Sequence, residues 1–319
     1  MMLFDIAMLV AGLVLLVFAG DYLVKGAVGL AENLGIPALI IGLTIVAFGT
    51  SAPELFVALQ SALTGVPDIA TGNVVGSNIA NVLLVMGLPA LFSPIHANQR
   101  GLSRNVAVML AFTVAFMWLI SDGLLSRLEA AGLFGGLLVF IAAQAWRAQQ
   151  AIAAADEEEV PGDYHEEIGE APHSPALIAV YLIGGVIGLP IAAHFTVTGA
   201  SSIAAAFGVS EAAIGLTIVA IGTSLPELAT SLAAALRREA DVALGNIIGS
   251  NIFNLAAIMG ITGMVIAVPI SPDIITRDNW VMLVTSLLLA VICFARITTG
   301  KALGAAMLAA YVAYVVLVF

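Results

Sequence analysis

Charged residues are scarce in this chain of 319 residues. Only 10% are Asp, Glu, Lys or Arg, 61% are hydrophobic, and the mean hydropathy is +1.10. Soluble domains carry about 25% charged residues, so this composition excludes a soluble globular protein and indicates a polytopic helical membrane protein. Acidic residues outnumber basic ones by 21 to 10, which argues against a nucleic-acid partner.

Cysteine is almost absent, since Cys293 is the single one. One cysteine cannot form an internal disulfide, and Cys293 has no Cys or His neighbours in sequence for a zinc site. We therefore expect it to be a small core residue, and we expect no cofactor. The apolar N-terminus runs into Asp21 and Lys25 without a basic segment before it, which favours a retained first span over a cleaved signal peptide.

A polar sequence is present twice within the apolar background. Residues 42–87 and 215–260 align without a gap at a constant offset of 173 residues, the separation of Glu54 and Glu227, with about half the positions identical. Each copy keeps one glutamate in an apolar run, where polar groups are costly. This pattern predicts a buried ion site built from two halves of one chain.

Ten apolar stretches are long enough to cross a membrane. They lie near 3–29, 38–63, 69–92, 104–120, 128–146, 175–200, 211–236, 242–268, 279–295 and 302–318. Five spans per repeat is an odd number, so the second repeat enters the membrane inverted relative to the first. The predicted fold class is an all-α polytopic membrane protein: ten transmembrane helices as two inverted five-helix repeats, with broken helices 2, 3, 7 and 8 around a midplane ion site.

Basic residues predict the orientation of the spans. With the N-terminus outside, Arg127 and Arg277 fall in external loops, whereas most other basic residues fall in cytoplasmic ones. The cytoplasmic set is Arg100, Arg104, Arg147, Arg237, Arg238, Arg296 and Lys301. The positive-inside rule thus selects N-out, C-out. The predicted domains are the first repeat at 1–146, an acidic cytoplasmic linker at 147–174 and the second repeat at 175–319. The linker is interpreted as a solvated tether, or alternatively as a weak regulatory cation site.

Each copy carries a motif typical of a broken helix. The first is Gly49-Thr50-Ser51-Ala52-Pro53-Glu54, and the second is Gly222-Thr223-Ser224-Leu225-Pro226-Glu227. Proline removes an amide and clashes with the preceding turn, so we expect a break just before it. Such a break would free the carbonyls of Ala47 and Phe48, which is tolerated at membrane depth only beside a cavity or ion path.

A second polar element follows in each copy, with Gly76 or Gly249 as a further predicted break. Ser77 and Asn81 are four residues apart and share a helix face, as do Ser250 and Asn254. No histidine lies in either copy, so the candidate donors are all oxygens, which suits Na⁺, Ca²⁺ or Mg²⁺.

Some of these residues also have a purely structural interpretation. A glutamate after a break could cap a helix, and the glycines could pack helices together. The asparagines Asn73, Asn246, Asn78 and Asn251 could satisfy freed backbone groups. Asp21 and Lys25, four residues apart, are expected to pair. His194, at the position matching Asp21, is expected either to hydrogen-bond within the bundle or to sense protons.

The motifs GTSAPE, GTSLPE, GNVVGSN and GNIIGSN resemble the α-repeats of the sodium/calcium exchanger family, in the cation/Ca²⁺ antiporter superfamily, and most of all its prokaryotic branch. The resemblance implies that Glu54 and Glu227 are the central ligands of Ca²⁺ and Na⁺. It further implies flanking Na⁺ ligands from Thr50, Ser51, Thr223, Ser224 and the carbonyls of Ala47 and Ala220, with further ligands from Ser77, Ser250, Asn81 and Asn254. Some relatives, including the potassium-dependent branch, carry aspartate at the position of Asn254, so K⁺ cotransport is not expected.

These observations predict a secondary antiporter that exchanges Na⁺ for Ca²⁺ by alternating access, with spans 1 and 6 sliding past a fixed site. The alternative is Ca²⁺/H⁺ exchange on the same glutamates. Other classes are a cation channel, which usually needs symmetric oligomers, and an intramembrane hydrolase, for which no His or Cys lies beside the motifs. The expected partners are Ca²⁺, Na⁺ and the lipid bilayer. The chain is expected to function as a monomer in a prokaryotic inner (plasma) membrane.

Overall fold

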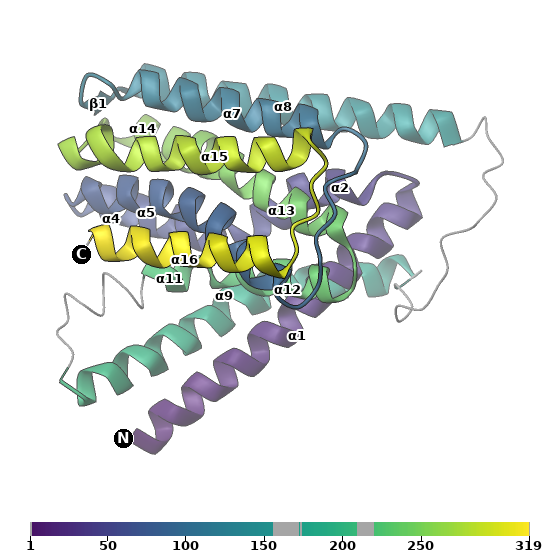
Figure 1. Ribbon diagram of the computed structural model, residues 1–319, viewed down its shortest axis with the longest axis horizontal. Helices are drawn as coiled ribbons and strands as arrows, with labels where there is room; N and C mark the ends of the chain where they lie inside the picture. Colours follow the sequence, from purple (N-terminus) through teal and green to yellow (C-terminus); the bar gives the residue numbers. More distant parts are fainter. Residues whose placement is uncertain (1, 156–171, 173, 209–219, 319) are drawn as a thin grey trace.

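The protein is described by a computed structural model that covers residues 2–155, 172, 174–208 and 220–318. Within these ranges the chain is mainly helical (Figure 1). The first half contains α1 (Met2–Leu34), α2 (Ala38–Ile41), π-helical η1 (Gly42–Val46), α3 (Ala47–Thr50), α4 (Ala52–Leu63), α5 (Pro67–Ala80), η2 (Asn81–Val85), α6 (Gly87–Ala90), α7 (Leu102–Leu119), β1 (Leu124–Leu125) and α8 (Arg127–Ala155).

The second half has a similar sequence of elements. It contains α9 (Pro175–Ala206), α11 (Ala220–Thr223), α12 (Leu225–Leu236), α13 (Ala240–Phe253), η4 (Asn254–Ile258), α14 (Met259–Val265), β2 (Val268–Pro269), η5 (Ile274–Asp278), α15 (Asn279–Phe294) and α16 (Lys301–Val318). The strands β1 and β2 pair antiparallel, with Leu124 opposite Pro269 and Leu125 opposite Val268. The segment between α7 and α8 therefore meets the segment that follows α14.

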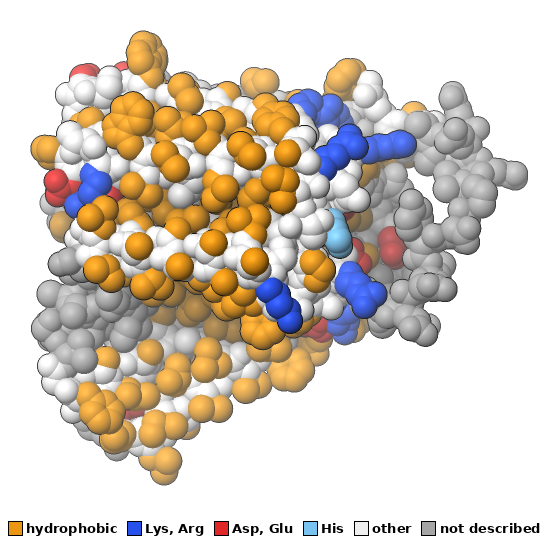
Figure 2. Space-filling model, in the orientation of Figure 1, with side chains coloured by type: hydrophobic (Ala, Val, Ile, Leu, Met, Phe, Trp, Pro, Cys, Tyr) orange, Lys and Arg blue, Asp and Glu red, His pale blue; other side chains and the backbone are white. Residues whose placement is uncertain are grey.

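Eight of the described helices are long and apolar enough to cross a membrane, and the bent pair Ala38–Thr50 and Ala52–Leu63 makes a ninth span if it is counted as one. Apolar side chains cover much of the face shown in Figure 2, and Trp118 on α7 is 73% exposed. Such a surface suits contact with lipid and not with water. The chain is an integral membrane protein. The predicted span at 211–236 is described only from Ala220 onward, so the count of ten stays a prediction.

The predicted break in the second span is confirmed. The two helices of the bent pair meet at an angle of 44° around Ser51, and Pro53 lies in the first turn of α4. Proline is tolerated there because the first amides of a helix have no partner within it. The second copy has the same local structure, with Ser224 between α11 and α12 and Pro226 in the first turn of α12.

The carbonyl of Ala47, which the sequence predicted to be freed, is not free in this structure. Its oxygen accepts the N–H of Ser51 at 3.0 Å and lies 3.3 Å from the hydroxyl of Thr50, whose single proton goes either here or to Asn246. The break comes late enough that the helical bond from Ser51 to Ala47 is retained. In the second copy the N–H of Ser224 donates instead to the carbonyl of Ile221, at 3.1 Å.

The predicted breaks at Gly76 and Gly249 are wrong. Both glycines lie inside continuous spans, Ile69–Ala90 and Ala240–Val265, because glycine keeps its N–H and does not interrupt the helical ladder as proline does. A Cβ on Gly249 would lie 2.6 Å from the Cβ of Ala47, so this glycine permits close helix packing. The irregularity in each span is a π-helical segment that begins at Asn81 or Asn254, at equivalent positions in the two copies.

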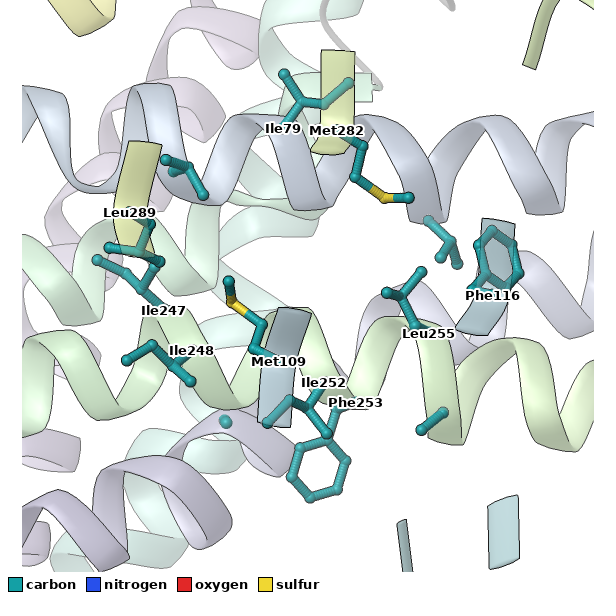
Figure 3. Packing of buried hydrophobic residues seen from close by; sticks show 14 of the residues in the cluster. Ile79, Met109, Phe116, Ile247, Ile248, Ile252, Phe253, Leu255, Met282 and Leu289 are labelled. Carbon is teal, nitrogen blue, oxygen red and sulfur yellow. The ribbon is translucent and has the colours of Figure 1, made fainter. Parts of the chain in front are cut away.

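Helix α13 forms the centre of the molecule. Each of its residues from Val242 to Phe253 is buried. Its apolar side chains, among them Ile247 and Ile252, lie in a core with Met109 of α7 and Leu289 of α15 (Figure 3). The polar residues of this helix are therefore enclosed by packed apolar side chains.

Helices α1 and α9 form a pair that lies at an incline to the rest of the bundle (Figure 1). Their backbones approach closely because glycines lie at the contact. A Cβ on Gly185 would lie 2.6 Å from the Cβ of Leu23, and one on Gly199 would lie 2.7 Å from the carbonyl oxygen of Asp5. Small residues at such contacts are typical of helix packing in membranes.

An ion pair between Asp21 and Arg237 connects helix α1 of this pair to the end of α12. Lys25 pairs with Asp21 at 3.1 Å, as the sequence predicted, and Asp21 also pairs with Arg237 at the end of α12. His194 is exposed on α9 and makes no hydrogen bond among the described residues, so the predicted hydrogen bond within the bundle is not found. The side chain lies on the outside of the helix pair.

The two ends of the bundle differ in charge. At one end, Ile95 bridges to Thr299, and His96 Nδ1 lies 3.0 Å from the Thr298 hydroxyl. Most Lys and Arg side chains visible in Figure 2 gather at this end. Helix α8 continues to Ala155, past residue 147 where the linker is predicted to begin. Residues 156–171 and 173 of the predicted linker lie outside the described part.

We expect Gly185→Ala to destabilise the α1–α9 pair. The new methyl group would overlap Leu23, and overpacking of this kind costs about 1–3 kcal/mol. The measurement is the thermal unfolding midpoint of the purified protein in detergent. The matched control is Gly184→Ala on the same helix, where a Cβ meets nothing within 4 Å. Equal midpoints for the two variants would show that the close approach at Gly185 does not matter for stability.

Candidate functional site

Two buried glutamates lie at the start of the helices that follow the breaks. Glu54 is in the first turn of α4 and Glu227 is in the first turn of α12, with exposed fractions of 0% and 1%. The break around Ser51 or Ser224 brings each carboxylate to a helix N-terminus, where the unpaired amides favour negative charge. The same local sequence in the two repeats therefore places both carboxylates in the buried interior of the protein.

The hydroxyl groups beside each glutamate contact the opposite repeat. Ser51 Oγ donates to Glu227 Oε1 at 3.0 Å. Thr50 Oγ1 donates to Asn246 Oδ1 at 3.1 Å and lies 3.5 Å from Ser250 Oγ. The break of the first repeat thus fits against α12 and α13 of the second.

Reciprocal contacts come from the second break. Thr223 Oγ1 donates to Asn73 Oδ1 at 3.1 Å, and Ser224 Oγ donates to Ser77 Oγ at 3.4 Å. Both partners lie on α5. The two copies of the motif therefore interlock, and neither half of the site is complete without the other.

Four asparagines form two amide pairs between the repeats. Asn81 Nδ2 donates to Asn251 Oδ1 at 3.1 Å, and Asn254 Nδ2 donates to Asn78 Oδ1 at 3.0 Å. Asn78 Nδ2 in turn donates to the carbonyl of Asn251 at 3.4 Å. These bonds fix the amide orientation, so that the Oδ1 atoms of Asn81 and Asn254 are turned away from the pairs and have no donor among the described residues.

Buried oxygens without a donor gather in these residues. They are both carboxylate oxygens of Glu54, Oε2 of Glu227, and Oδ1 of Asn81 and Asn254. A buried acceptor without a donor costs on the order of 1–3 kcal/mol, and native interiors contain few of them. The arrangement has the chemistry of an oxygen-ligand site for a hard cation. No group of three His, Cys, Asp or Glu residues that could hold a metal occurs in the described ranges.

The structure brings together nearly all the residues that the sequence singled out. Glu54, Glu227 and their neighbouring Thr and Ser residues lie at the contact between repeats, with Ser77, Ser250, Asn81 and Asn254. The side chain of Ala220 lies outside the described residues. Cys293 is buried on α15, as expected of a core residue.

Sequence reasoning missed part of the surroundings. The hydroxyl of Ser231 accepts Asn246 Nδ2 at 3.2 Å, and the thioethers of Met109 and Met282 lie 3.6 Å from the amide nitrogens of Asn251 and Asn78. Ser231 is one helical turn beyond Glu227, so helical spacing is a signal that could have found it. The sulfur contacts depend on distant helices and have no local signal.

Many apolar helices, polar contacts between the two repeats and buried oxygens without a donor are typical of a membrane protein that transports cations. The family described as sodium/calcium exchanger protein matches residues 4–146 and 177–319. The chain therefore belongs to the sodium/calcium exchanger family, whose members are membrane antiporters and not enzymes. The resemblance seen in the sequence motifs is confirmed.

Individual relatives match over most of their length. The chain is 36% identical to the inner membrane protein YrbG of Escherichia coli, and the match covers 100% of this chain and 98% of the relative. It is 39% identical to the putative antiporter CaxA of Alkalimonas amylolytica, over 87% of this chain and 86% of the relative. A solved structure of the sodium-calcium exchanger NCX_Mj, soaked with Na⁺ and Sr²⁺, superimposes with a TM-score of 0.83 at 32% identity and covers 99% of each chain.

Proposed function

We propose that this protein exchanges Na⁺ for Ca²⁺ across the membrane by alternating access. The observation that carries the proposal is the set of buried oxygens without donors on Glu54, Glu227, Asn81 and Asn254. These five oxygens are of the type that Ca²⁺ prefers, and neighbouring hydroxyl groups or water would complete its six to eight ligands. The similarity to NCX_Mj, named as a sodium-calcium exchanger, supports the same ion pair.

The charge of the site explains why the carrier would be an exchanger. Two ionised carboxylates buried without a counter-ion are costly. One Ca²⁺ neutralises them, and two or more Na⁺ do the same. Because Ca²⁺ and Na⁺ need the same oxygens, they occupy the site alternately. The protein with an empty, charged site changes poorly between the inward-facing and outward-facing states. Obligatory exchange follows from this charge requirement.

The proposed ligands are those implied by the family resemblance. Glu54 and Glu227 bind either ion at the centre. The flanking Na⁺ ligands are the hydroxyls of Thr50, Ser51, Thr223 and Ser224, with the carbonyls of Ala47 and Ala220. The Ala47 carbonyl accepts the N–H of Ser51, so a lone pair stays available to Na⁺ when Thr50 gives its proton to Asn246. Ser77, Ser250, Asn81 and Asn254 supply the other oxygens.

The proposed architecture has ten spans in two inverted five-span repeats, with N-out and C-out topology in a prokaryotic plasma membrane. Basic side chains gather mainly at one end of the bundle (Figure 2), which supports assignment of that end to the cytoplasm. The pair α1 and α9 is the proposed moving part. Its helices pack tightly on each other through glycines, so they can shift as one body past the site.

A Na⁺ gradient directed out of proteoliposomes is expected to drive ⁴⁵Ca²⁺ uptake, because Na⁺ carried outward is released at the outer face, where the vacated site binds Ca²⁺ and returns with it to the inside. The control is the same vesicles with equal Na⁺ on both sides. Uptake driven by a pH gradient alone, with no effect of Na⁺, would replace the proposal by Ca²⁺/H⁺ exchange.

Glu54→Gln and Glu227→Gln are each expected to reduce Ca²⁺ flux to background. Glutamine keeps the shape of the side chain and removes a negative charge that a divalent cation needs. Flux is measured as in the previous experiment, and the thermal unfolding midpoint shows whether each variant is folded. Flux close to that of the wild type in either variant would assign that glutamate a structural role.

Transport is expected to proceed without K⁺. An additional cation held inside the membrane needs an additional anion, and Asn254 and Asn81 offer only dipoles, both already paired through their amide nitrogens. The measurement is Na⁺-driven Ca²⁺ flux with K⁺ replaced by choline on both sides. Loss of flux in choline would show that another group supplies a K⁺ site.

A further inference from the structure

The two halves of the site differ in one asparagine contact. Asn246 and Asn73 occupy equivalent positions, and each accepts the hydroxyl proton of a threonine from the other repeat, Thr50 and Thr223, at 3.1 Å. Asn246 Nδ2 has two acceptors, Ser231 Oγ at 3.2 Å and the carbonyl of Glu227 at 3.4 Å. Asn73 Nδ2 is buried and has no acceptor among the described residues.

One substitution between the repeats explains the difference. The position equivalent to Ser231 is Ala58, which is completely buried on α4. Helix α4 packs on α5 as α12 packs on α13, so Ala58 offers a methyl group where Ser231 offers a hydroxyl. The amide of Asn246 is therefore held at both ends, whereas that of Asn73 is held at its oxygen alone.

The orientation of these amides controls what the threonines can offer to a cation. A hydroxyl has one proton and two lone pairs. With Oδ1 of Asn246 facing it, Thr50 gives its proton to Asn246 or to the carbonyl of Ala47, and its lone pairs are available to a cation. A rotated amide would instead direct its NH₂ at Thr50 and occupy a lone pair.

The two halves of the site also differ in the hydrogen bonds that their glutamates accept. Ser51 donates to Glu227 Oε1 at 3.0 Å, but the equivalent Ser224 donates to Ser77, and both oxygens of Glu54 lack a donor among the described residues. The turn that carries Glu227 is also held through its carbonyl by Asn246. The half of the site around Glu227 and Thr50 is more firmly organised than the half around Glu54 and Thr223.

We propose that Ser231 is a positioning residue that holds Asn246 so that Thr50 presents its lone pairs to Na⁺, and that Ala58 leaves the Thr223 half the weaker Na⁺ site. This inference rests on the proposed function. Ca²⁺ depends chiefly on the two carboxylates, so Ser231 sets the balance between Na⁺ and Ca²⁺ more than the affinity for Ca²⁺.

The test measures the half-saturating concentrations of Na⁺ and Ca²⁺ and the maximal exchange rate in proteoliposomes. Ser231→Ala removes one orienting hydrogen bond, so the half-saturating Na⁺ concentration is expected to rise about fivefold, while that of Ca²⁺ changes less than twofold. Ser231→Thr keeps the hydroxyl and is expected to restore the wild-type values. Ala58→Ser supplies the missing acceptor to Asn73 and is expected to lower the half-saturating Na⁺ concentration.

Na⁺-dependent thermal stabilisation of the same variants in detergent gives a second measure that needs no flux. A wild-type protein without Na⁺-driven Ca²⁺ exchange would overturn the proposed function itself. An active wild type whose Na⁺ dependence is unchanged by Ser231→Ala and Ala58→Ser would overturn this inference alone. An equal loss for both ions, or a fall in maximal rate only, would also overturn it, since those results indicate a general structural role.

Discussion

Two carboxylates that are buried in a membrane protein, with most of their oxygens unpaired, set the constraint on which the rest of the structure depends. Glu54 and Glu227 are almost completely inaccessible, and three of their four oxygens have no donor in the described part of the chain. A protein can retain such a pair only if a positive ion occupies it for most of its lifetime or if protons neutralise it. The hydrogen bond that Ser51 donates to Glu227 does not neutralise the charge of the two carboxylates, so this requirement remains.

The surrounding helices keep the two carboxylates buried. Helix α13 is buried throughout, and glycines such as Gly249 bring it into close contact with the broken helix of the other repeat. The amide pairs Asn81–Asn251 and Asn254–Asn78 connect the two spans near their π-helical segments. Such segments are frequent at functional sites. The inclined pair α1 and α9 forms a separate group of helices beside the helices that carry Glu54 and Glu227 (Figure 1).

Much of this arrangement could be predicted from the sequence because it depends on local chemistry. The helix break depends on Pro53 and Pro226, and the convergence of the polar residues follows from the duplication, which aligns without a gap. The spans follow from long apolar runs, which agree with most of the observed helices. The difference between Ser231 and Ala58 is also visible in the alignment of the repeats, although its meaning depends on the asparagines they face.

Other features depend on contacts that a single sequence does not reveal. Whether Gly249 breaks a helix or packs it is decided by Ala47 and Leu43, which approach from another span. The direction of each asparagine amide depends on its partner in the opposite repeat. Helix α8 extends to Ala155, through residues whose polarity favoured a linker. These residues, RAQQAIAAA, are good helix formers, so the helix continues beyond the apolar run.

If one set of oxygens serves both ions in turn, Na⁺ must compete with Ca²⁺ at equilibrium. The measurement is ⁴⁵Ca²⁺ binding to the purified protein at increasing Na⁺ concentration. We expect one exchangeable Ca²⁺ per chain in the absence of Na⁺, and complete displacement of that Ca²⁺ as Na⁺ approaches saturation. Ca²⁺ that stays bound at full occupancy in saturating Na⁺ would show that the two ions have separate sites.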